Sequence, residues 1–100
     1  MPETVPVTVS QLIARHAAGI ASIVDEQPAT TLTDFADQLR TAAVYLDRSG
    51  INGGDELDMA ALYLVDAEHT SSADELQVLA GKAAEYLKDA DDIVAEYRLA

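Results

Sequence analysis

Carboxylates are the most numerous side chains that could do chemistry in this sequence, which holds 18 Asp and Glu but only two His and no Cys. General acid or base catalysis needs a carboxyl group whose pKa is shifted by apolar surroundings or by a close like charge. The adjacent acidic pairs of this chain mostly occupy predicted helix ends or solvent-facing positions, where acids are simply solvated. They are Asp25-Glu26, Asp55-Glu56, Asp74-Glu75 and Asp91-Asp92. The sequence therefore predicts no catalytic residues, and we expect the protein not to be an enzyme.

The remaining reactive side chains do not complete a catalytic or metal site. Cysteine thiolates are absent, and no Gly-x-Ser-x-Gly sequence is present to form a nucleophile elbow. Asp66 and His69 are spaced to share a helix face and could offer two metal ligands, but nothing in the sequence supplies the others. His16 falls at the margin of an apolar helix stripe, where a structural role is the better interpretation. We expect neither a metal ion nor a cofactor.

The loop from Asp47 to Asp55 is acidic and glycine-rich, a composition that suggests calcium or phosphate binding. A calcium loop starting at Asp47 would need an oxygen ligand at its fifth position and glycine at its sixth, where this chain has Ile51 and Asn52. A phosphate site would lack the P-loop lysine, and the two acids after the glycines would repel the anion. A helix C-terminus at Gly50, followed by a turn, accounts for the whole loop.

The acids are unevenly distributed along the chain. Residues 1–50 carry six acids and three Arg, a net charge of −3, whereas residues 51–100 carry twelve acids and three basic residues, a net charge of −9. In the last predicted helix, four acids recur every three or four residues and share one face: Glu85, Asp89, Asp92 and Glu96. A solvated face, a recognition surface for a basic partner and an adaptation to high salt would each explain this pattern.

Helical periodicity runs through the sequence, and no strand-type alternation competes with it. We predict an all-α fold, a small four-helix bundle with a long C-terminal helix. Residues 1–7 are predicted to be a flexible lead, and residues 8–100 a single helical domain. Capping residues at Thr8, Thr31 and Ser72 mark helix starts. The helices are expected at residues 8–26, 31–49, 55–68 and 72–98.

The predicted helix over residues 72–98 is too long for its neighbours. At 1.5 Å per residue it measures about 37 Å, against about 25 Å for the first two helices. Its apolar positions continue to the end, and an exposed apolar stripe would be expected to meet a partner or a second copy. A homodimer through this segment and a helix that bends or frays back onto its own core both remain open. The residues predicted for self-association are Tyr86, Leu87, Ile93, Val94 and Tyr97.

Two functional hypotheses follow from the charge and the long helix. The first is a non-enzymatic interaction protein that binds a basic protein surface through its acidic half, as an inhibitor, antitoxin, immunity protein or DNA mimic would. Its predicted contacts are Glu85, Asp89, Asp92 and Glu96. The alternative is a self-associating assembly protein in which the long helix is the dimer interface and the acids serve only solubility or high-salt adaptation.

The composition also limits the partners and the location that we expect. A net charge of −12 argues against direct binding of nucleic acid and against docking on an anionic membrane. The longest apolar run has seven residues, far fewer than the roughly 20 that cross a bilayer, and no signal peptide is visible. We therefore expect a cytoplasmic protein.

Overall fold

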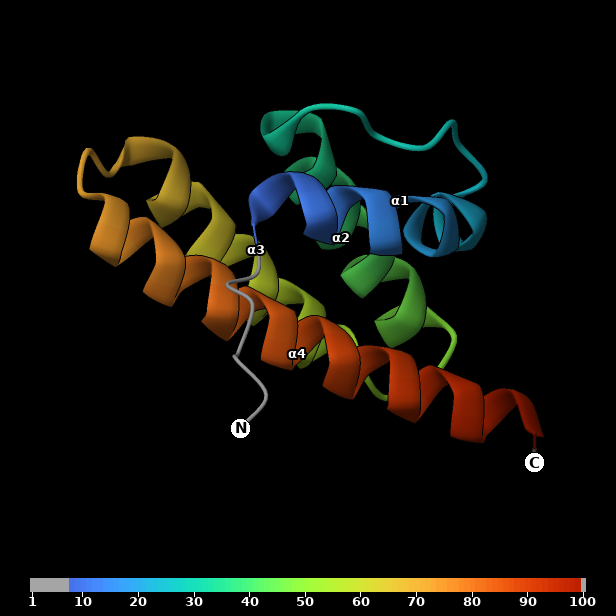
Figure 1. Ribbon diagram of the computed structural model, residues 1–100. Coiled ribbons are helices and arrows are strands. Elements are labelled where there is room, and N and C mark those ends of the chain that lie inside the picture. Colours follow the sequence, from blue (N-terminus) through green and yellow to red (C-terminus); the bar gives the residue numbers. More distant parts are fainter. Residues whose placement is uncertain (1–7, 100) are drawn as a thin grey trace.

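The computed structural model describes the backbone of residues 8–99 and the side chains of residues 8–96, and it confirms the predicted all-α fold (Figure 1). Its four helices are α1 (Val9–Val24), α2 (Leu32–Arg48), α3 (Gly54–His69) and α4 (Ala73–Leu99). Each helix begins and ends within two residues of the predicted position. No strand occurs in residues 8–99. The predicted flexible lead, residues 1–7, lies outside the described residues.

The helices begin at the capping residues that the sequence marks. The hydroxyl of Thr8 accepts a hydrogen bond from the N–H of Gln11 at 3.1 Å, and the Gln11 side chain accepts one from the Thr8 N–H at 3.0 Å, so the predicted capping box is complete. Thr31 and Ser72 cap α2 and α4 by accepting from the N–H three residues later. These bonds satisfy donors that the first turn of a helix otherwise leaves without partners.

The glycine-rich loop between α2 and α3 is a helix stop followed by a turn. Gly50 adopts the left-handed conformation, with φ of 70°. The N–H of Ile51 donates to the carbonyl of Leu46 at 2.9 Å, and the N–H of Gly50 donates to the carbonyl of Asp47 at 3.2 Å. These are the two bonds of a Schellman motif. Ile51, which follows Gly50, packs against the core.

Helix α1 ends earlier than the proline at position 28 requires. Asp25 has a φ of 56°, and it is the one non-glycine residue with positive φ in the described part of the chain. The N–H of Glu26 donates to the carbonyl of Ala21 at 3.0 Å, which closes the last turn. This stop was missed in the sequence because Asp adopts the left-handed region less readily than Gly and is not a usual C-terminal signal.

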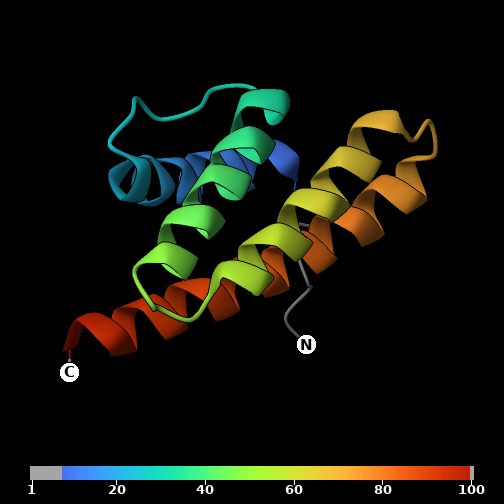
Figure 2. The same cartoon turned by 180° about the vertical axis from the view of Figure 1, so that it is seen from behind.

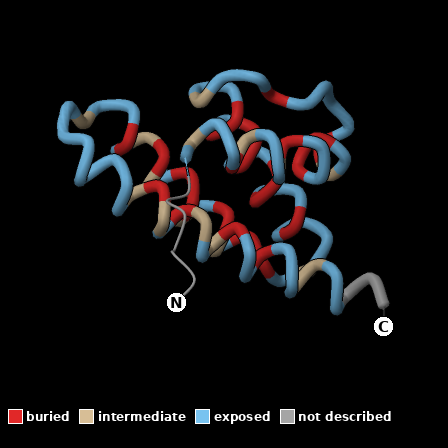
Figure 3. The backbone as a smooth tube through the Cα atoms, viewed as in Figure 1, coloured by how far each residue is buried: buried red, intermediate tan, exposed pale blue. Residues whose placement is uncertain are grey.

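Helices α3 and α4 run side by side as an antiparallel pair, and α1 and α2 cover one part of it (Figures 1 and 2). Helix α3 packs extensively against both α2 and α4, whereas α1 packs mainly on α2 and makes little contact with α4. The end of the α3–α4 pair that carries the turn at residues 70–72 projects beyond α1 and α2, and most of its residues are exposed (Figure 3).

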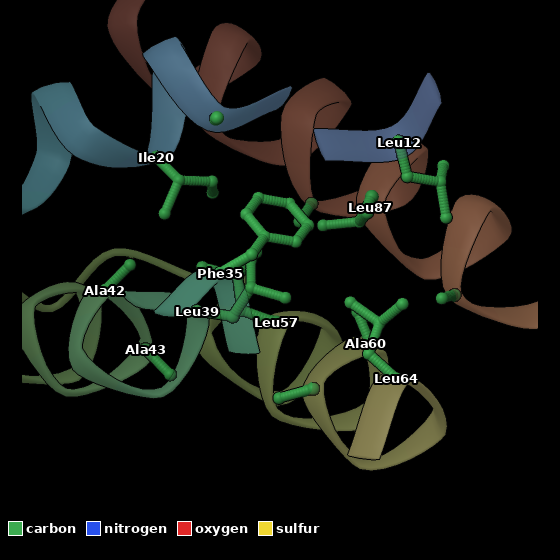
Figure 4. Close-up of a cluster of buried hydrophobic side chains, with 14 of the residues drawn as sticks. Leu12, Ile20, Phe35, Leu39, Ala42, Ala43, Leu57, Ala60, Leu64 and Leu87 are labelled. Atoms are coloured by element: carbon green, nitrogen blue, oxygen red, sulfur yellow. The ribbon is translucent and has the colours of Figure 1, made fainter. Parts of the chain in front are cut away.

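The core is built from large side chains of all four helices and from alanines where helices cross. Ala42 and Ala43 of α2 and Ala60 and Ala61 of α3 are at most 1% exposed and belong to this core. Side chains from all four helices converge around Phe35 (Figure 4). The largest fully buried side chains are Phe35, Leu12, Leu39, Leu57, Leu64 and Leu87.

Among the apolar side chains that the structure describes, those near the N-terminal end of α4 are less covered than those from Leu87 to Val94. Leu76 is 38% exposed and Val78 61%, whereas Leu87 is 1% exposed and Ala90 2%. After Leu87, Val94 packs against the core, and a Cβ built on Gly53 in the turn before α3 would lie 3.6 Å from Val94 and 3.8 Å from Ile93. A homodimer through this part of α4 stays a prediction. The segment packs on the core of its own chain without any break in the helix.

Candidate functional site

The twelve acids of residues 51–100 all lie on α3 and α4, five on the first helix and seven on the second. Every one of these acids except Glu56 is exposed. Because the two helices run side by side (Figure 2), the acidic half of the sequence becomes one antiparallel helix pair, residues 54–99, which we call the acidic hairpin.

The four predicted partner contacts lie on the outward side of α4. All four are exposed, and their spacing along one continuous helix places them on the side opposite Leu87, which faces the core. The structure therefore brings together on one face the residues that the sequence predicts: Glu85, Asp89, Asp92 and Glu96.

Few cations lie close to these carboxylates. The Nζ of Lys88 donates to Oδ2 of Asp92 at 2.9 Å, and in the described residues this is the only Lys or Arg ion pair. The hydrogen bond to Asp92, helped by the charge of the same carboxylate, raises the pKa of Lys88 above its ordinary value of 10.5. Both side chains are largely exposed, so the pair is worth little stability and leaves most of the negative charge without a counterion.

His16 contacts the acidic hairpin from α1. Its Nδ1 lies 3.0 Å from Oδ2 of Asp91, and its side chain is 9% exposed. The residues that line the adjacent pocket are His16, Arg15, Lys88, three acids and Ala84. In this geometry His16 links α1 to α4, and its structural role stays a prediction.

The predicted weak metal candidate remains incomplete. Asp66 and His69 are both exposed near the end of α3. Across the described residues, no group of three or more His, Cys, Asp or Glu side chains is arranged to hold a metal ion. The described helices also include none that is long and apolar enough to cross a membrane.

The residues predicted for self-association are mostly engaged within their own chain. The ring of Tyr86 stacks on that of Tyr63, with centroids 5.8 Å apart and planes 19° apart. Leu87 is enclosed in the core, Val94 packs against it, and Ile93 is half-buried. The Tyr97 side chain lies outside the described residues. Self-association stays a prediction, and Leu87 has no free surface to offer it.

Among the side chains that the structure describes, the exposed large apolar ones lie elsewhere. Two of them are on the projecting end of α4, one is on the outward side of α3, and two are on α2. They are Leu76, Val78, Leu62, Val44 and Tyr45. The sequence analysis missed Val78 and Leu62 as surface residues because both lie in helices whose neighbours could not be placed from periodicity alone.

An apolar groove of about 450 Å³ lies between α1 and α4, and the sequence analysis missed it. We call it the α1–α4 groove. Asp91 is its one charged lining residue. Gly19 also lines it, and a Cβ built on Gly19 meets no atom within 4 Å. The other lining residues are Ile20, Ile23, Leu57, Ala90, Val94 and Ala95.

Comparison of the chain with protein-family models, with curated proteins and with solved structures found no match.

Proposed function

We propose that this protein is a non-enzymatic interaction protein that binds a basic protein surface through the outward face of the acidic hairpin. The observation that supports the proposal most directly is the gathering of twelve carboxylates on two adjacent helices, eleven of them exposed. Like charges spaced three or four residues apart destabilise a helix slightly, so this arrangement has a cost that a bound basic surface would remove.

The negative charge of the acidic hairpin determines how binding should depend on the partner and on the salt concentration. Complementary charges speed the encounter of two proteins and select the partner by sign and spacing. Exposed charges are screened over about 8 Å at physiological ionic strength and over about 3 Å at 1 M salt. Binding through the acidic hairpin should therefore weaken steeply as salt is added. A cytoplasmic location belongs to the same proposal, since a chain with no Cys requires no oxidising compartment.

The experiment compares two variants that lose the same amount of charge from different places. The first carries Glu85→Gln, Asp89→Asn, Asp92→Asn and Glu96→Gln on the outward face of α4. The control neutralises four exposed acids outside the acidic hairpin: Glu26, Asp34, Asp37 and Asp47. Binding of each variant to hen lysozyme, a small basic protein used as the probe, is measured by calorimetry at several salt concentrations.

If the recognition surface lies on α4, the two variants should lose unequal amounts of affinity for lysozyme. We expect the α4 variant to bind at least tenfold more weakly at low salt, and the control variant to stay within threefold of the parent. Equal losses in the two variants would mean that net charge alone attracts the probe. The acids would then serve solubility or high-salt adaptation, and the proposal would be wrong.

A second candidate function, assembly as a homodimer, is favoured by the exposed apolar residues on the projecting end of the acidic hairpin. Val78 is 61% exposed, so Val78→Asp should leave the fold intact while placing a charge in any interface there. Sedimentation equilibrium over a range of concentrations tests this candidate. A dimer that Val78→Asp dissociates would support it, and a monomer at all concentrations would contradict it.

A further inference from the structure

We propose that the α1–α4 groove receives the apolar side of a basic amphipathic helix, so that the groove and the acidic face of α4 form one docking surface. This inference rests on the proposed function and names the kind of partner segment that it would bind. The groove supplies an apolar contact that the acidic face alone does not have, and the two surfaces meet on the same stretch of α4.

The walls of the groove suit a helix as the occupant. Helices α1 and α4 form its two sides and make little direct contact with each other, while Leu57 of α3 contributes from below. Small exposed residues, Gly19 on α1 and Ala95 on α4, stand on the two sides, so a third helix can approach both backbones. Helices pack with their axes about 8–10 Å apart when the residues between them are small.

The apolar lining determines which side of that helix enters. Ile23 and Val94 line the groove and are half-buried, so they present branched apolar side chains to the guest beside the core residue Ile20. A guest helix would match them with apolar residues at positions i, i+3 or i+4, and i+7. Burial of such side chains contributes more to affinity than exposed ion pairs do.

The charges around the groove determine the sign of the guest's flanking residues. Asp91 lines the groove, and the next residue, Asp92, belongs to the acidic face of α4. Glu96 follows one turn later on the same face. A helix with Lys or Arg beside its apolar stripe would place cations near these carboxylates. An acidic helix would be repelled.

Three synthetic peptides of about 18 residues test the inference. The first is a helix with a Leu stripe flanked by Lys and Arg. The second keeps every Lys and Arg but replaces each Leu by Gln, and the third keeps the Leu stripe but replaces the basic residues by Glu. Binding to the full chain is measured by fluorescence anisotropy. We expect the first peptide to bind at least tenfold more tightly than the second, and the third not to bind.

A groove-filling variant provides the test on the protein side. Gly19→Leu adds a side chain where nothing lies within 4 Å, so it should occupy the groove without disturbing the core. Gly81→Leu is the matched control, because Gly81 is also helical, has nothing within 4 Å of its Cβ and does not line the groove. We expect Gly19→Leu to weaken binding of the first peptide at least tenfold, and Gly81→Leu to change the affinity less than twofold. Circular dichroism confirms that both variants fold.

The outcomes separate this inference from the proposed function. If the first and second peptides bind equally well and Gly19→Leu has no effect, the groove is not used and this inference is overturned, while the acidic surface stands. If no basic peptide binds, and lysozyme binding does not depend on the four acids of α4, the proposed function fails as well. Amide chemical-shift changes at Gly19, Ile23 and Ala95 on addition of the first peptide would locate it in the groove directly.

Discussion

Gly54 begins α3 where this helix passes α2, and replacing it tests how closely the two helices approach. A Cβ on Gly54 would lie 2.8 Å from Oδ1 of Asp47 and 3.1 Å from the carbonyl oxygen of Ala43. The Asp47 side chain is exposed and can rotate away. The Ala43 carbonyl belongs to the backbone of α2, so it can move only if α2 shifts relative to α3 by a few tenths of an ångström.

The expected cost of Gly54→Ala follows from this contact. Overpacking by a methyl group costs about 1–3 kcal/mol, and the better helix propensity of Ala returns up to about 1 kcal/mol. We therefore expect the free energy of unfolding to fall by about 1–2 kcal/mol. For a domain of this size, that change lowers the melting temperature by about 4–16 °C. Thermal and urea unfolding followed by circular dichroism measure it.

Two further variants decide whether the reasoning is right. Gly81→Ala adds a methyl group in the interior of α4 with no atom within 4 Å, so it should raise the free energy of unfolding by up to about 1 kcal/mol. The double variant Asp47→Ala/Gly54→Ala removes the side-chain clash but keeps the contact with the carbonyl. Full recovery in the double variant, or a stabilising effect of Gly54→Ala alone, would refute the close approach of the two backbones.

Other predictions concern the middle and the N-terminal part of α4, the end of α1, and the Lys88–Asp92 pair. Leu87→Ala should lower the free energy of unfolding by about 2–5 kcal/mol because Leu87 is 1% exposed, whereas Val78→Ala should change it by no more than about 0.5 kcal/mol. Chemical denaturation measures both changes. Similar effects of the two variants would contradict the difference in burial along α4. Asp25→Gly should stabilise the protein by about 0.5–1 kcal/mol, since it relieves a positive φ and removes a negative charge from the C-terminal end of α1. Asp25→Asn removes only the charge and should give a smaller gain. Thermal unfolding measures both variants. The raised pKa of Lys88 means that its pair with Asp92 stabilises the fold below pH 10.5 and loses that effect as the pH rises through the folded pKa. Lys88→Gln should therefore melt slightly below the parent at pH 8 and together with it well above pH 10.5, and a gap that widens with pH would contradict the pairing.

The sequence predicted those features that depend on residues close together in the chain. Thr8 and Ser72 cap helices through bonds that span three residues, and Gly50 ends α2 through a turn closed within six residues. Such signals act locally and can be recognised from spacing alone. The four acids of α4 share a face for the same reason, because helical periodicity fixes their relative positions.

The features that the sequence did not predict depend on how the helices cross. Periodicity shows that Leu76 and Leu87 lie on the same stripe of α4, but it does not show which of them α1 and α2 will cover. Gly19 has the same sequence pattern whether it faces another helix or an empty groove. Only the path of α1 over α4 distinguishes these cases, and that path is set by packing between residues more than 60 positions apart.

That path also explains why charge and apolar surface meet on α4. The helix turns its core-facing side, with Leu87, toward α1 and α3. Successive residues of a helix point about 100° apart, because 3.6 residues complete a turn. Asp91 therefore lines the groove while its neighbour Asp92 belongs to the outward acidic face. A partner that fills the groove must pass within reach of that face, and a partner bound only by charge would leave Ile23 and Val94 beside an open groove. The arrangement favours one segment that is both apolar and basic over two separate ligands.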